Sequence, residues 1–122
     1  MPVRSLNSSV LKWPDAATTH KAVRDWAIEQ AANNPEIVRI GFFGSYAEGN
    51  WGVGSDLDLV MVVKESLEPF ERRACRWDTT SLPVPADLLV FTEQEWEEGW
   101  FSQKFNRIMR KKVVWVYPGE KR

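Results

Sequence analysis

The stretch that decides the fold is Gly44-Ser-Tyr-Ala-Glu-Gly-Asn-Trp-Gly-Val-Gly-Ser-Asp-Leu-Asp-Leu59. It follows residues 36–43, whose β-branched and aromatic composition is typical of a strand. Residues 46–49 are expected to form a short helical turn, and residues 50–54 a glycine-rich loop. A second strand is predicted over residues 56–63, where a continuous apolar run indicates burial on both faces.

The Gly44-Ser45 pair has the properties of a phosphate-binding turn. A helix that begins there presents free backbone N–H groups and a positive dipole end, which attract anions. Gly44 would let a phosphate approach the backbone, and the Ser45 hydroxyl would add a donor. A simple capped turn is the alternative, and Ser45-Tyr-Ala-Glu48 also matches a capping box in which Glu48 accepts from the Ser45 N–H.

Two carboxylates open the second predicted strand. Asp56 and Asp58 are two residues apart, so a strand would place them on the same face. Two like charges side by side repel, and a divalent cation such as Mg²⁺ would relieve that repulsion. Asp87, early in a third predicted strand over residues 86–91, faces the same pocket if the second and third strands are neighbours. It would then complete a metal site and act as a base; solvated acids at strand ends are the alternative.

The other elements follow from local patterns. A helix is predicted over residues 15–33, with Asp15 as N-cap and an apolar stripe at helical spacing. A second helix is expected over residues 69–77, and a third begins with the capping box at residues 92–95 and continues, with a break near Gly99, to about residue 111. A last strand covers residues 113–117. This order predicts one α/β (α+β) domain over residues 1–122, with a small mixed sheet flanked by helices.

The composition excludes several classes of protein. The chain is 43% hydrophobic and 27% charged, as expected for a globular domain. Its net charge of −1 does not favour binding of long nucleic acid, which requires a basic face. A single cysteine, Cys75, forms no internal disulfide. No apolar run approaches the roughly 20 residues that span a bilayer, so we expect a cytoplasmic protein without a membrane partner.

Two further features leave alternatives open. Seven tryptophans are many for this length; core packing is the first interpretation, and a partner-binding surface is the alternative. A basic run ends at Lys112 and is expected to be a solvated face, with contact to phosphate or a partner as its alternative. Its members are Lys104, Arg107, Arg110, Lys111 and Lys112.

Taken together, these residues resemble the minimal nucleotidyltransferases of the DNA polymerase beta superfamily. The family pattern is Gly-Ser, ten intervening residues and Asp-x-Asp, followed by a third acid on a later strand; here Gly44-Ser45 precedes residues 46–55 and then Asp56-Leu57-Asp58. The resemblance covers residues 36–91, about half the chain. It implies a polymerase beta-like nucleotidyltransferase fold, two Mg²⁺ ions, and ATP or another nucleoside triphosphate as donor.

The resemblance also implies roles for individual residues. Asp56, Asp58 and Asp87 would be the catalytic and metal-binding residues. Gly44, Ser45 and Ser55 would bind the nucleotide.

Small members of this superfamily often pair with HEPN-domain toxins, and some adenylylate a tyrosine of that partner. The resemblance therefore implies an antitoxin that transfers AMP from ATP to a hydroxyl of a protein, whereas a homo-oligomer is left open. A catalytically weak module that neutralises a partner by binding is the alternative, and a small-molecule modifier is a third. One position departs from the family pattern: Glu48 stands where Arg is usual, and its charge is expected to weaken binding of a triphosphate.

Overall fold

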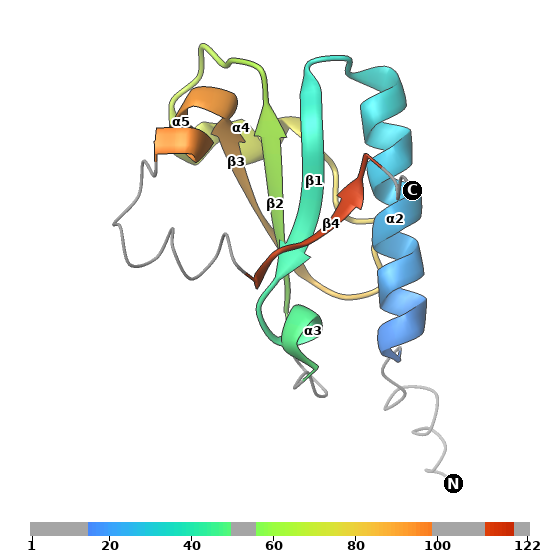
Figure 1. Cartoon of the computed structure of the whole chain (residues 1–122). Helices are drawn as coiled ribbons and strands as arrows, with labels where there is room; N and C mark the ends of the chain where they lie inside the picture. The colour runs from blue at the N-terminus through green and yellow to red at the C-terminus, as the bar shows by residue number, and fades with distance from the viewer. Residues whose placement is uncertain (1–14, 50–55, 99–111, 119–122) are drawn as a thin grey trace, which may run out of the picture.

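The computed structural model describes residues 15–49, 56–98 and 112–118 (Figure 1). Helices and strands alternate along most of the chain. In order, the elements are α2 (Ala16–Asn33), β1 (Ile37–Phe43), α3 (Ser45–Glu48), β2 (Leu57–Val63), α4 (Phe70–Arg73), the 3-10 turn η1 (Ala74–Arg76), β3 (Ala86–Thr92), α5 (Glu93–Glu98) and β4 (Val114–Tyr117). The prediction of a mixed α/β fold with a small mixed sheet flanked by helices is confirmed.

The four strands form one sheet in the order β3-β2-β1-β4. β1 is antiparallel to both β2 and β4, and β2 is parallel to β3. The chain reaches the parallel position of β3 through α4 and η1, which replace the single helix expected over residues 69–77. The helical segment ends at Arg76, one residue before the predicted end, because Trp77 adopts an extended backbone conformation, with φ −113° and ψ 136°.

Helix α2 covers one face of the sheet (Figure 1). It begins where expected, because the Asp15 carboxylate accepts a hydrogen bond of 2.8 Å from the Thr18 N–H. Its buried side chains are Thr19, Val23, Trp26 and Ala27, which recur at the helical spacing that the sequence predicted. The indole N–H of Trp26 also donates to the Asp78 carbonyl at 2.9 Å, which holds the loop before β3 against the helix.

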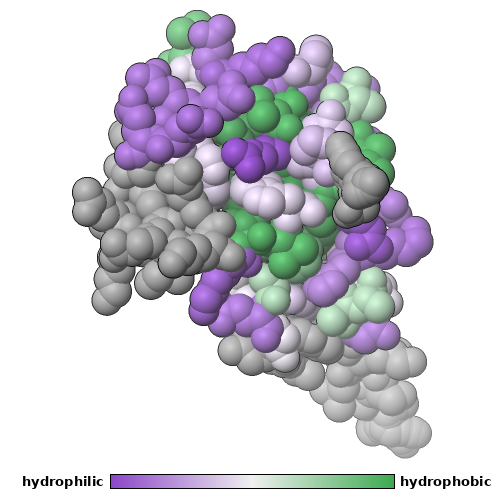
Figure 2. Space-filling model, viewed as in Figure 1, coloured by the Kyte–Doolittle hydropathy of each residue, from purple (hydrophilic) through white to green (hydrophobic). Residues whose placement is uncertain are grey.

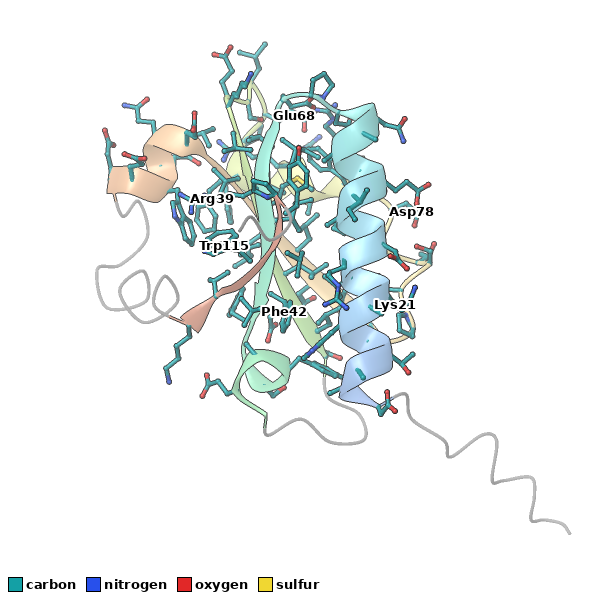
Figure 3. The ribbon with its side chains drawn as sticks, turned by 45° about the vertical axis from the view of Figure 1, so that its right-hand side comes forward. Lys21, Arg39, Phe42, Glu68, Asp78 and Trp115 are labelled. Atoms are coloured by element: carbon teal, nitrogen blue, oxygen red, sulfur yellow. The ribbon has the colours of Figure 1, made fainter. Side chains whose placement is uncertain are left out.

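The opposite face of the sheet carries a second apolar cluster. Its buried members are Val60, Val62, Phe91 and Trp96. The ring centres of Phe91 and Trp96 lie 5.4 Å apart, and those of Trp96 and Trp115 lie 5.5 Å apart. The Arg39 guanidinium stacks on Trp115, 4.6 Å from the centre of its ring (Figure 3). Some apolar surface remains visible in the middle of the molecule, beside the hydrophilic side chains of α5 (Figure 2).

Helix α5 begins with the predicted capping box. The Thr92 N–H donates to Glu95 at 3.0 Å, and the Glu95 N–H donates to the Thr92 hydroxyl at 3.1 Å. Arg73 of α4 connects the two helices, because its guanidinium donates hydrogen bonds to both carboxylate oxygens of Glu95 in α5, at 2.6 and 3.1 Å. The rest of the expected helix, residues 99–111, lies outside the described residues.

Four of the seven tryptophans lie within the described residues. Trp26, Trp77 and Trp96 are buried and Trp115 is half-buried, which agrees with core packing for these four. Within residues 15–49, 56–98 and 112–118, no helix is both long and apolar enough to cross a membrane.

Candidate active site

The register of β2 and β3 brings two of the three aspartates together. Asp58 lies directly opposite Asp87 in this parallel pair, so the expectation that the second and third strands are neighbours is met. Side chains alternate along each strand, and Asp58 and Asp87 therefore project from the face opposite α2. Asp58 is half-buried, whereas Asp56 and Asp87 are exposed.

Asp58 is the electrostatically strained member of this group. Its pKa is raised by burial first, then by the negative charges of Asp87 and Asp56. Both neighbouring carboxylates therefore act on Asp58, and the spacing of Asp56 and Asp58 had predicted one of these two interactions. A bound cation would relieve this repulsion.

The same carboxylates are the candidate ligands of a metal ion. Among the residues that the structure describes, no group of three His, Cys, Asp or Glu side chains is close enough to hold a metal ion. Mg²⁺, however, usually takes one or two carboxylates and completes its shell with water and substrate phosphates. The facing pair Asp58 and Asp87, with Asp56 two residues away, fits that demand in donor type and charge.

The turn after β1 lies directly against Asp58. Phe43 pairs with Asp58 in the sheet, and Gly44 follows with φ 79° and ψ −151°. A Cβ atom built at Gly44 would collide with Asp58 Oδ2, so only glycine allows this approach and this backbone conformation. The structure therefore brings together Gly44, Ser45, Asp58 and Asp87, while Ser55 lies outside the described residues.

The capping box expected at Ser45 and Glu48 is wrong. Gly44, which has no side chain, is the N-cap of α3, and Ser45 is the first helical residue. Glu48 is instead 3.4 Å from the Lys112 ammonium. The motif is misleading here because Gly44 accepts a conformation that lets the helix begin one residue earlier than the Ser-x-x-Glu pattern indicates.

A cavity of about 590 Å³ opens beside Asp58 and Asp87. Its size lies within the range of small-molecule sites. Sequence analysis did not assign its other lining residues, which come from the end of β1, from η1 and the loop after it, and from β3. They are Phe43, Ala74, Trp77, Thr79, Ala86, Leu88 and Leu89. Of these, only Phe43 had a local signal, because it directly precedes Gly44.

Comparison with known proteins identifies the domain family and similar folds. The family model described as a nucleotidyltransferase domain matches residues 25–116. No curated protein gives a significant match. A Sulfolobus solfataricus structure, provisionally assigned as a nucleotidyltransferase, is 22% identical over 82% of this chain and 80% of its own, with a TM-score of 0.58. A toxin–antitoxin structure with AMP-PNP is 17% identical over 80% of this chain and 74% of its own, with a TM-score of 0.51. At these identities, the two structures show likeness of fold.

Proposed function

This chain belongs to the nucleotidyltransferase domain family, and from that premise we propose that it transfers AMP from ATP to a hydroxyl group of a protein partner. The observation that carries the proposal is the direct opposition of Asp58 and Asp87, with the Gly44 backbone against Asp58. The group combines hard oxygen donors with a backbone that a phosphate can approach. Both are needed for transfer from a nucleoside triphosphate.

Each residue has a distinct role in the proposed reaction. The Gly44 backbone and the Ser45 hydroxyl bind the terminal phosphates of ATP, while Asp56 and Asp58 hold its metal ions. Two Mg²⁺ ions, when bound, neutralise the carboxylates and the phosphates around the reacting phosphorus.

Asp87 joins the metal-binding carboxylates and takes the proton of the acceptor hydroxyl. The acceptor oxygen forms a bond to the α-phosphorus, the bond from that phosphorus to the bridging oxygen breaks, and pyrophosphate leaves. The exposure of Asp87 supports its role as base, because an acceptor from another protein can reach it.

The acceptor that we propose is a HEPN-domain toxin, with this chain as its antitoxin. Two arguments support it: the sequence resemblance to minimal nucleotidyltransferases, and a fold shared with a structure of a toxin–antitoxin with AMP-PNP. The half-buried Asp58 and the exposed Asp87 line the cavity, so a side chain of a partner could enter it beside these carboxylates.

A second function is favoured by one specific observation. The exposed Glu48 carboxylate follows the proposed phosphate-binding turn, where its negative charge opposes a triphosphate. This charge would suit a module that neutralises its partner by binding alone, with little or no transfer.

Labelled ATP distinguishes these two functions. The chain is incubated with Mg²⁺ and the protein encoded beside it, using ATP labelled on the α-phosphate or on the γ-phosphate. Nucleotidyl transfer labels the partner from the α-position only, and Asp58→Asn and Asp87→Asn abolish that label. Asp25→Asn, on the exposed side of α2, is the matched control and retains it. A stable complex without label supports the binding module, whereas neither complex nor label rejects both functions for this partner.

A further inference from the structure

Glu48 places a carboxylate at the last position of α3, shortly after Gly44 and Ser45. Its side chain is 41% exposed. A negative charge at this place opposes a triphosphate bound at Gly44 and Ser45, where the proposed function puts the phosphates of the donor. A nearby positive charge would remove this conflict.

Lys112 supplies such a charge. Its ammonium lies 3.4 Å from Glu48 Oε1, and its side chain is 52% exposed. Lys112 shortly precedes β4, which runs antiparallel to β1 with Val114 opposite Phe42. β1 continues from Phe42 to Phe43 and is followed by Gly44, so the start of β4 lies near the end of β1 at which α3 begins. The ion pair with Glu48 therefore places the Lys112 ammonium beside α3, the helix that begins at the proposed phosphate site.

This ion pair is poorly suited to a stabilising role. Exposed pairs contribute little to stability, because water screens the charges and both long side chains lose freedom. The Lys112 ammonium, however, has three N–H donors and can donate to Glu48 and to a phosphate oxygen at the same time. Lysine binds phosphates as a compact point charge, so it needs no rigid second contact to act.

We propose that Lys112 binds the triphosphate of the donor nucleotide and that Glu48 is a positioning residue, which holds the Lys112 ammonium beside Gly44 and Ser45. This inference rests on the proposed function and extends it by one binding residue and one positioning residue. Glu48 then orients a cation at the site, and the net local charge of the pair is zero before the nucleotide binds.

The test is a double-mutant cycle read by calorimetric titration with ATP and Mg²⁺. Lys112→Met should weaken ATP binding about 10-fold, since it removes a charge-assisted contact and leaves Glu48 uncompensated. In the Glu48→Gln background, the same lysine substitution should cost only about 2- to 3-fold, because that lysine is no longer held in place. Adenosine, which has no phosphate, should bind all four proteins with equal affinity.

Lys64→Met is the matched control. Lys64 is also exposed, but it directly follows β2 at the end of the strand away from Asp58, so its loss should leave ATP affinity within 2-fold of the wild type. A purely structural role for Lys112 would change the melting temperature and would weaken ATP and adenosine alike.

Three results would overturn the inference: unchanged ATP affinity in Lys112→Met, equal losses for ATP and adenosine, or the same effect of Lys112→Met in both backgrounds. If the wild type binds ATP, and Asp58→Asn weakens that binding but Lys112→Met does not, this inference fails alone. If the wild type binds no nucleoside triphosphate with Mg²⁺, the proposed function fails and this inference fails with it.

Discussion

Replacing Asp58 by Asn should stabilise the protein without bound metal while it abolishes nucleotidyl transfer. Burial and the charges of Asp87 and Asp56 raise the pKa of Asp58 above its ordinary value of 3.8. A raised folded-state pKa means that the stability linked to the protonated form is present below the unfolded pKa and is lost as the pH rises through the folded pKa. At neutral pH the ionised Asp58 therefore destabilises the fold, and a neutral amide of the same shape relieves it.

The magnitude follows from the strand register. Asp58 and Asp87 are paired on neighbouring parallel strands, and the spacing of neighbouring strands places the two residues about 5 Å apart. Two like charges at that distance repel by about 1 kcal/mol in water and about 3 kcal/mol at an effective dielectric constant of 20. Because Asp87 is exposed, the lower figure applies. A gain of about 1 kcal/mol raises the melting temperature of a domain this size by roughly 3–6 °C.

Thermal unfolding at neutral pH, with and without Mg²⁺, tests this reasoning. Asp87→Asn should give a similar gain, and the double variant should gain less than the sum, because one substitution already removes the repulsion. Mg²⁺ should raise the melting temperature of the wild type more than that of Asp58→Asn. Asp25→Asn, which loses only an exposed pair with Lys21, is the control and should give no gain. A melting temperature of Asp58→Asn at or below that of the wild type would refute the argument.

Three other substitutions have definite expected outcomes. Arg73→Met should destabilise the protein by about 3 kcal/mol in urea unfolding, because it leaves the mostly buried Glu95 carboxylate without its cation; unchanged stability would contradict this. Burial raises the pKa of Glu95, but hydrogen bonds from Arg73 and from a backbone N–H outweigh burial and lower it. The stability that Glu95 contributes is therefore present above its unfolded pKa of 4.5 and is lost as the pH falls through its lower folded-state pKa. Glu95→Gln removes this contribution, so it should flatten the acid side of the curve of unfolding free energy against pH. Gly44→Ala should lower the melting temperature more than Gly49→Ala, and only Gly44→Ala should abolish ATP binding. Both glycines have positive φ, but only a Cβ at Gly44 meets Asp58. Equal losses of melting temperature in the two variants would show that backbone strain is the whole effect.

Local sequence signals predicted most of the elements and the residue types of the candidate site. The Asp15 N-cap and the capping box of Thr92 and Glu95 act within three residues, so the sequence alone locates the starts of α2 and α5. The spacing of Asp56 and Asp58 likewise predicts a shared face wherever a strand forms. One local pattern misled: Ser45 and Glu48 match a capping box, but the same turn can begin at Gly44 when that glycine adopts positive φ.

The amino-acid sequence by itself determined where most of the described helices and strands form. It also determined that a Gly-Ser turn and an Asp-x-Asp pair flank one loop. Capping, periodicity and side-chain alternation carry this information because they depend on near neighbours. Only the tertiary structure decided that Asp87 lies opposite Asp58, that Lys112 reaches Glu48, and that Trp77 lines the cavity beside the carboxylates. These relations join residues far apart in the chain, and they depend on which strands pair and in which register. Burial of the apolar faces of the whole sheet selects that pairing, and no short segment contains this information.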